Sequence, residues 1–358
     1  MKSAWTALAL GAAFAQGTAL AQTAPGNGVT IYGRLDVVVD AVRFSSTPTT
    51  TSANARYLST DTSYWGVRGT EDLGGGWRAQ FKLENGFSVD TGALGSATAF
   101  WNREALVGVG HSQYGTVLLG SQYGPAFWIT AKVDPFQRSG NGALFNLLQA
   151  NAGNAQRGYR LVQDNAVQYI SPTFAGFTGR VLYGLSERPS EPRDLGEFKS
   201  FGLEYAQGPF YAGLSYEDEG VATAPAGGER SKKTYTLGAT YDFKFVKLHG
   251  YLLRNKLEAS PGDLEGYLLG LTYPIGRGAI RTSYAAAEVD GVAGSKATVA
   301  AIGYTHELSK RTTLYTGYAR LNNGATANFG LWPSSKTYGT AARGQDISSL
   351  QVGIRHFF

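Results

Sequence analysis

The sequence predicts an all-β protein: a transmembrane antiparallel β-barrel of about sixteen strands. Three observations support this prediction. The chain ends in a strand, residues 350–358, in which apolar and polar side chains alternate. It begins with a segment typical of an export signal. Between the two, strand-like segments are joined alternately by short turns and long polar connections, which is the layout of a bilayer-spanning barrel.

The terminal strand places Leu350, Val352 and Ile354 on one face and Gln351 and Arg355 on the other. Alternation at period two suits a strand with lipid on one side and water on the other. Taken alone, the same pattern also fits the edge strand of a β-sandwich. We expect the final residue, Phe358, to act as an assembly signal.

The first residues carry an export pattern. A positive start (Met1, Lys2) precedes an apolar stretch over 4–15 and a small-residue cleavage site at 19–21. We therefore expect a signal peptide over 1–21 and one barrel domain over 22–358. No later run of about 18 apolar residues could form a membrane-spanning helix. The expected location is the bacterial outer membrane, crossed many times by strands.

Composition narrows the possible functions. The 358 residues include 48 Gly, 21 Tyr and 18 Phe but no Cys, and the formal net charge is +5. Basic residues form no cluster larger than Lys232 and Lys233, so nucleic-acid binding is not expected. The four histidines are scattered and have no cysteine companions, so we expect no metal site and no cofactor.

Strand segments and their connections can be assigned along the whole mature chain. The first strand has Val29, Ile31, Leu35, Val37 and Val39 on its apolar face, and later strands repeat that alternation. A strand over about 99–110 has an ambiguous facing. Short turns are expected at 71–76, 111–115, 172–176, 206–209, 242–245, 274–278 and 307–311. Longer connections are expected at 45–57, 89–98, 123–163, 186–197, 217–231, 255–264, 288–295 and 321–345.

The connection over 123–163 differs from the rest because it is long and partly apolar. Phe127, Trp128, Ile129, Phe145 and Leu148 all require burial. Long loops of this kind are usually functional or disordered. The lumen offers a place for burial, so we expect the loop to fold inward and narrow the channel. A loop packed over the barrel mouth or against a neighbouring subunit is the alternative.

Several motifs resemble the general porins of betaproteobacterial type, a family of sixteen-stranded trimeric barrels. The matching segments, in order, are 29–36, 65–76, 102–108, 164–172, 309–315 and 352–358. The resemblance implies passive diffusion of small hydrophilic solutes and ions through a water-filled pore. It also implies that 123–163 is the constriction loop, that the assembly is a homotrimer, and that the exterior meets the lipid bilayer and lipopolysaccharide.

Charged side chains at the narrowest point set the selectivity of such a channel. Basic residues outnumber acids on the faces expected to point inward, which predicts a weak anion preference that salt screens. The expected pore-lining or constriction residues are Arg34, Asp36, Tyr64, Arg68, Arg78, Lys82, Arg103, Asp134, Gln168 and Arg180. Alternatively, several of these arginines pair with neighbouring acids and have no electrical effect.

The chain departs from the family at three positions. Members often carry Arg where this sequence has Tyr64, Ser121 and Gln168. Strong anion selectivity is therefore not expected, and a substrate-specific porin, with Tyr64 as an aromatic wall residue, is an alternative. One further alternative is an outer-membrane hydrolase that uses Ser112, which lies in a motif one residue off a nucleophile elbow. Another is an adhesin or structural barrel that is plugged by 123–163 and conducts nothing. The prediction is a channel and not an enzyme.

Overall fold

The computed structural model describes residues 27–149, 158–187, 196–222, 229–258 and 262–358. The expected signal peptide, 1–21, lies outside the described residues. The strands are β1 Gly28–Phe44, β2 Ala53–Thr60, β3 Tyr64–Gly74, β4 Trp77–Gly86, β5 Glu104–His111, β6 Gly115–Tyr123, β7 Val162–Ile170, β8 Phe177–Gly184, β9 Phe198–Gln207, β10 Phe210–Ala222, β11 Glu229–Asp242, β12 Lys247–Leu257, β13 Leu264–Ile275, β14 Gly278–Val289, β15 Ala297–Glu307, β16 Thr312–Asn323 and β17 Ile347–Phe357. The helices are α1 Pro125–Val133, α2 Phe145–Leu148 and α3 Ser335–Tyr338.

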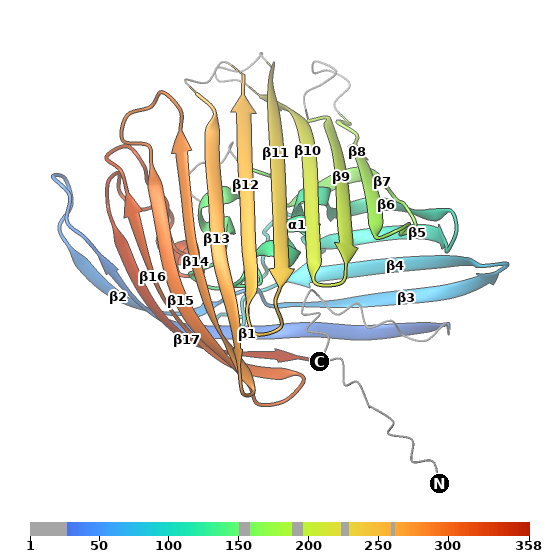
Figure 1. Cartoon of the computed structure of the whole chain (residues 1–358), viewed down its shortest axis with the longest axis horizontal. Coiled ribbons are helices and arrows are strands. Elements are labelled where there is room, and N and C mark those ends of the chain that lie inside the picture. The colour runs from blue at the N-terminus through green and yellow to red at the C-terminus, as the bar shows by residue number, and fades with distance from the viewer. Residues whose placement is uncertain (1–26, 150–157, 188–195, 223–228, 259–261) are drawn as a thin grey trace, which may run out of the picture.

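The strands close into one antiparallel barrel (Figure 1). One edge of β1 pairs with β17, from Arg34 opposite Phe357 to Phe44 opposite Ile347. The other edge of β1 pairs with β2 along its second half and with β3 along its first half. β2 and β3 are thus one wall strand interrupted at 61–63, and the seventeen strand segments form a barrel of sixteen. A closed barrel has no free strand edge, as a bilayer requires.

Three expected connections were wrong. The return strand already begins at Ala53, so only 45–52 connect β1 and β2. The connection expected at 89–98 spans 87–103, since β4 ends at Gly86 and β5 starts only at Glu104. The polar segment 217–231 is mostly strand, since β10 extends to Ala222 and β11 starts at Glu229. Polar residues form strands here because the barrel extends past the apolar belt, where Asp218 pairs in register with Lys233 and Glu219 with Lys232.

The structure settles the facing of the strand that was ambiguous in sequence. In β5, Val107 and Val109 are exposed on the outer face, whereas Glu104 is buried and points inward. Exposed apolar residues of the outer face and buried polar residues of the inner face alternate throughout the wall, as expected for a barrel with lipid outside and water inside.

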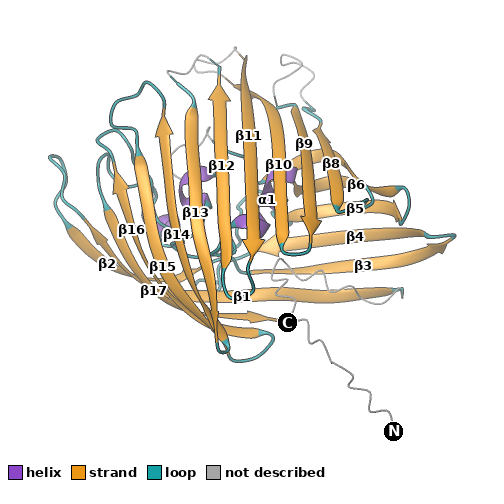
Figure 2. Ribbon diagram, viewed as in Figure 1, coloured by secondary structure: helices purple, strands orange, loops and turns teal. Residues whose placement is uncertain are grey.

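The described parts of the long connection between β6 and β7, 124–149 and 158–161, fold into the barrel, as expected. α1 and α2 lie inside the ring of strands (Figure 2); α1 packs against β9 to β12, and α2 packs against β13 to β15. The largest buried apolar cluster therefore lies between this loop and the wall, and includes Ile129, Val133, Leu144, Leu148 and Tyr251. No helix in the described part of the chain is long and apolar enough to cross a membrane.

Candidate functional site: the lumen beside the inward loop

Inward-facing glycines make room for the loop on the wall. A Cβ at Gly202 would lie 2.6 Å from Cβ of Pro125, and one at Gly213 would lie 2.8 Å from Cγ1 of Ile129. A Cβ at Gly270 would lie 2.6 Å from Cγ of Pro135. Real Cβ atoms do not approach this closely. The wall therefore lacks side chains where α1 and its continuation press against it, which is a recognised use of glycine in strands.

The carboxylate of Asp134 organises the loop after α1. Its Oδ1 accepts the backbone N–H of Phe136 at 2.9 Å, and its Oδ2 accepts those of Leu144 at 2.9 Å and Arg138 at 3.2 Å. Burial raises the pKa of Asp134 to about 6, partly offset by these backbone donors. Asp134, which we expected to face the channel, is turned into the backbone of its own loop.

The tip of the loop is fixed to the seam between β1, β16 and β17. The Nδ2 of Asn141 donates to the backbone oxygens of Gly317 and Ser349 at 3.3 and 3.1 Å. The backbone N–H of Asn141 donates to Oε1 of Gln351 at 3.0 Å. Ser139 donates to Asp61 in the break between β2 and β3. The loop is held at both its helix and its tip, so its position across the lumen is well defined.

Arg34 and Asp36, both expected to line the pore, belong to one buried network at this seam. Arg34 pairs with Asp36, and the Nε of Arg355 lies 2.7 Å from Oδ2 of Asp36. Both arginines also approach Asp61, at 3.7 and 3.9 Å. Tyr315 donates to Asp36 at 2.7 Å. Two arginines and two aspartates compensate one another, so this network anchors the loop and contributes little net charge.

A second charged group lies on β4 and β5. Lys82 pairs with Glu104 and lies 3.3 Å from Glu84. The Nε of Arg103 lies 2.6 Å from the other oxygen of Glu84. The structure thus brings together two expected residues, Lys82 and Arg103, with two acids that compensate their charge.

A third group, on β8, β9 and α1, has more cations than acids. Glu204 receives both Lys132 at 2.5 Å and Arg180 at 2.9 Å. Lys132 also lies 5.0 Å from the ring centre of Tyr211, and Arg180 lies 5.2 Å from that of Trp128. One carboxylate shared by two cations leaves a local positive charge beside the loop.

Arg68 and Arg138 form no ion pair with a carboxylate among the described residues. Arg68 lies 4.7 Å from the ring centre of Tyr32, and Arg138 lies 4.7 Å from that of Phe127. Arg138 also donates to Oγ1 of Thr130 at 2.7 Å. Aromatic faces attract such cations without neutralising them.

Aromatic rings and cations alternate beside the loop. Arg103 lies 4.6 Å from the ring centre of Tyr64 and 5.8 Å from that of Tyr123. Tyr123 stacks on Phe127 with ring centres 3.8 Å apart. We refer to Tyr64, Arg103, Tyr123, Phe127 and Arg138 as the aromatic–arginine row. The sequence pattern singled out Tyr64 and Arg103 but not Tyr123, whose only signal is its place as the first residue of the loop expected over 123–163.

Gln168, Arg78 and Phe358 were also expected to be functional and are not members of this row. Gln168 is buried, and its Nε2 donates to Oε1 of Gln122 at 3.0 Å and to the backbone oxygen of Tyr123 at 3.1 Å, so it supports the start of the loop. Arg78 is exposed next to the turn between β3 and β4. Phe358 exchanges two backbone hydrogen bonds with Gly33, of 3.2 and 3.1 Å, and so sits at the barrel seam.

No catalytic arrangement accompanies the motif around Ser112 in the described part of the chain. Nδ1 of the neighbouring His111 accepts the backbone N–H of Gln113 at 3.1 Å, which leaves Nε2 to donate to the backbone oxygen of Gly75 at 3.2 Å. Both nitrogens of the His111 imidazole are therefore engaged in hydrogen bonds with the backbone of turns. Among the described residues, no group of three His, Cys, Asp or Glu side chains could hold a metal ion.

Comparison with known proteins agrees with this architecture. Residues 4–326 match the family model described as Gram-negative porin. Outer membrane porin protein 32 of Delftia acidovorans is 32% identical over the whole of both chains. An outer membrane porin protein of Bordetella pertussis is 30% identical, with 83% of this chain and 82% of the relative covered. A solved anion-selective porin from Comamonas acidovorans has a TM-score of 0.81 and 30% identity, and the match covers 93% of this chain and 100% of that chain.

Proposed function

Because the chain belongs to the Gram-negative porin family, we propose that its lumen conducts small anions in preference to cations, with the selectivity set beside the inward loop. Family membership places it in the outer membrane as a passive diffusion channel and not as an enzyme. The geometry of the site bears on whether the channel favours anions or cations.

One observation supports the anion preference. In the charged groups of β4–β5 and β8–β9, each cationic side chain is more exposed than the acid it pairs with. Lys132 is 44% exposed and Glu204 is 5% exposed; Arg103 is 23% exposed and Glu84 is 4% exposed. The carboxylates lie against the wall and the cations reach towards water. A passing ion therefore meets the positive end of each pair first, which favours anions.

The experiment is a reversal potential measured across a planar bilayer under a tenfold KCl gradient. We expect the wild-type channel to favour chloride, and Lys132→Gln to reduce that preference because Lys132 is the most exposed of these cations. Arg254→Gln is the matched control, since Arg254 lies on the outer face of β12. Preference for potassium in the wild type, or equal shifts in both variants, would contradict the proposal.

A second candidate, a channel with a solute-binding constriction, is favoured by the aromatic–arginine row. Alternating rings and guanidinium groups offer stacking and charge to an aromatic carboxylate. On this candidate, benzoate blocks the chloride current saturably and acetate does not. Equal, non-saturating effects of the two anions would favour general diffusion alone.

The partners that we propose follow from the family and from the outer surface of the barrel. The family resemblance supports a homotrimer, and exposed apolar residues around the barrel support contact with the bilayer and with lipopolysaccharide. We also propose that 123–163 is the constriction loop and that Phe358 is an assembly signal. Ions and small hydrophilic molecules are the proposed solutes.

A further inference from the structure

A small cavity lies inside the barrel, between the tip of the inward loop and the wall of β14 to β17. Its volume is about 30 Å³, and its lining includes Ser139 and Gly140 of the loop and Arg281, Tyr315 and Arg355 of the wall. Arg281 is the fourth residue of β14, and Arg355 is the third residue from the end of β17. The cavity therefore lies on the side of the loop that faces the short turns. We call it the β14–β17 cavity.

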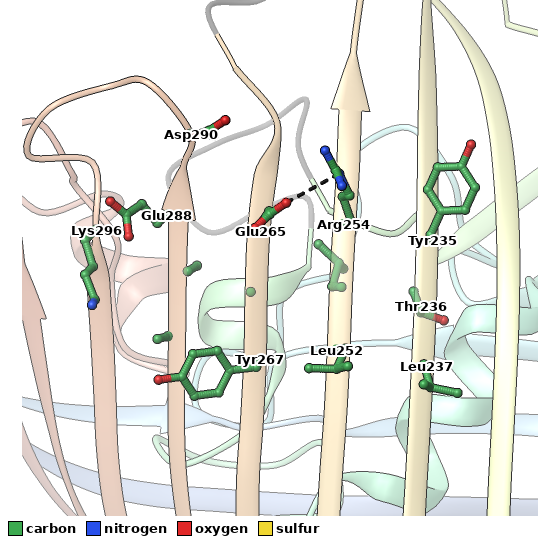
Figure 3. Close-up of a pocket in the computed structure, with 14 residues that line it drawn as sticks. Tyr235, Thr236, Leu237, Leu252, Arg254, Glu265, Tyr267, Glu288, Asp290 and Lys296 are labelled. Atoms are coloured by element: carbon green, nitrogen blue, oxygen red, sulfur yellow. Dashed lines mark ion pairs between the residues drawn. The ribbon is translucent and has the colours of Figure 1, made fainter.

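The charged side chains that line the β14–β17 cavity are all cationic. Among the described residues, its lining contains Arg281 and Arg355 but no Asp or Glu. The larger hollow on the outer face of β11 to β14 differs, because acids and cations share its rim, as Figure 3 shows for Arg254, Glu265, Glu288 and Lys296. Of these two spaces, the inner cavity therefore has the charge that an anion requires.

Arg281 supplies the net charge of the cavity. Its Nη1 donates to the backbone oxygen of Pro135, and its Nε is buried with no hydrogen-bond partner among the described residues. In the same part of the chain, no carboxylate forms an ion pair with Arg281. Asp134 and Glu307 attract it over a longer distance, and the carboxylate of Asp134 already accepts three backbone N–H groups. Because a guanidinium has five donors, Arg281 retains both charge and donors for an anion.

Arg355 holds a second guanidinium group beside the cavity. Its Nε donates to Oδ2 of Asp36 at 2.7 Å, and its Nη2 donates to Oγ of Ser139. These contacts fix the guanidinium and compensate its charge locally, so Arg355 contributes positioned donors more than net charge. Arg355 and Arg281 are nevertheless close enough to repel each other. An anion in the cavity offsets that repulsion.

The size and exposure of the cavity limit what can bind there. A volume of about 30 Å³ is enough for one or two water molecules, so a single halide ion fits and a sugar or an amino acid does not. Arg281 lies on the inner face of β14 and is partly exposed, so an ion in the channel can reach it. The cavity thus favours a small monovalent anion.

We propose that the β14–β17 cavity binds one halide ion, chloride under ordinary conditions, with Arg281 as the charged ligand and Arg355 beside it. The inference rests on the proposed function in one respect, because an anion-conducting lumen brings chloride to the cavity. The site is separate from the cations proposed to set the selectivity, since Lys132 and Arg180 pair with Glu204 beside β8 and β9. A channel site must also release its ion, and a single uncompensated charge at a partly exposed position meets that requirement.

The test is anomalous diffraction at the bromine edge from crystals of the full-length mature protein soaked in about 0.1 M sodium bromide, where charges are incompletely screened. We expect a bromide peak in contact with the guanidinium group of Arg281, and loss of this peak in Arg281→Gln. Arg277→Gln is the matched control and should keep the bromide. Arg277 is exposed in the short turn before β14, and its Nη2 donates to the backbone oxygen of Leu308 at 2.9 Å.

A wild-type cavity without bromide would overturn the proposal, as would a peak that persists in Arg281→Gln or is lost equally in both variants. A peak that appears only at much higher bromide concentrations would show an adventitious ion only and would also overturn it. The reversal potential tests the proposed selectivity separately. A channel that favours chloride but binds no bromide contradicts this inference alone, whereas bound bromide in a channel that favours potassium contradicts the proposed selectivity alone.

Discussion

Arg34 shows how an inward arginine can serve structure and not selectivity. Its partners Asp36 and Asp61 are fully buried, and removing one member of a buried pair leaves an uncompensated charge that costs about 3–5 kcal/mol. We predict that Arg34→Gln lowers the free energy of unfolding of the barrel by about 3–5 kcal/mol. Urea unfolding in detergent measures this change. Arg254→Gln, at an exposed ion pair, should give no measurable change. Equal stability of the two variants would refute the anchoring role.

Asp134 makes the inward loop sensitive to pH. Its pKa in the folded loop, about 6, lies above the ordinary value of 3.8 because of burial. The folded loop therefore favours the protonated carboxyl. This contribution to stability is fully present below about pH 3.8 and is lost as the pH rises through 6.

The measurement is hydrogen exchange of the loop amides at pH 5 and pH 8, corrected for intrinsic rates. We predict greater protection at pH 5 in the wild type. Asp134→Asn cannot titrate, so its protection should not differ between the two pH values. If the protection of the loop amides still depended on pH in Asp134→Asn, titration of Asp134 would not be the cause.

Alternation along single strands predicted which residues point inward, but it could not predict their partners. Lys82 was correctly placed on the inner face of β4, yet its partner Glu104 is on β5, whose facing was ambiguous in sequence. Asp61 lies in an interruption between β2 and β3 that no composition signal marked. Partners depend on register and on the path of the loop, and both are properties of the closed barrel.

Among the elements, the inward loop depends on glycines of the facing wall. Pro125 is rigid and lies where a side chain at position 202 would be. We predict that Gly202→Val displaces the start of α1 and produces larger and noisier single-channel currents. Gly250→Val places the same side chain on the outer face, where there is room, and should conduct as the wild type does.

Unchanged currents in a correctly folded Gly202→Val variant would show that contact of α1 with β9 does not control the channel. The apolar residues of the loop predicted burial inside the barrel, and that prediction was confirmed. The glycines could not be recognised as its contact surface, because in sequence they resemble other barrel glycines.

For the whole molecule, closure depends on the seam between β1 and β17. Phe358 adds two backbone hydrogen bonds to Gly33 at this seam, beyond the last residue of β17. We predict that deleting Phe358 reduces the amount of folded protein in the outer membrane, assayed by heat-modifiable mobility in gels. Deleting the exposed loop residue Gly339 is the control. Equal yields from both deletions would argue against an assembly role.

The sixteen-stranded barrel was predictable because its alternation is local and repeats many times. Selectivity is a property of the whole lumen and depends on which end of each ion pair faces water. Three cations expected from the family are absent at Tyr64, Ser121 and Gln168, yet Lys132, Arg103 and Arg180 still present positive ends beside the loop. The balance predicts an anion preference that is small and easily screened.

The most direct test of the anion preference is the reversal potential of the wild-type channel, measured at a fixed tenfold KCl ratio from low to high total salt. We predict a chloride-favouring potential that shrinks as salt rises, because the Debye length falls from about 10 Å at 0.1 M to about 3 Å at 1 M. A potassium-favouring potential, or a chloride preference that does not change with salt, would contradict it.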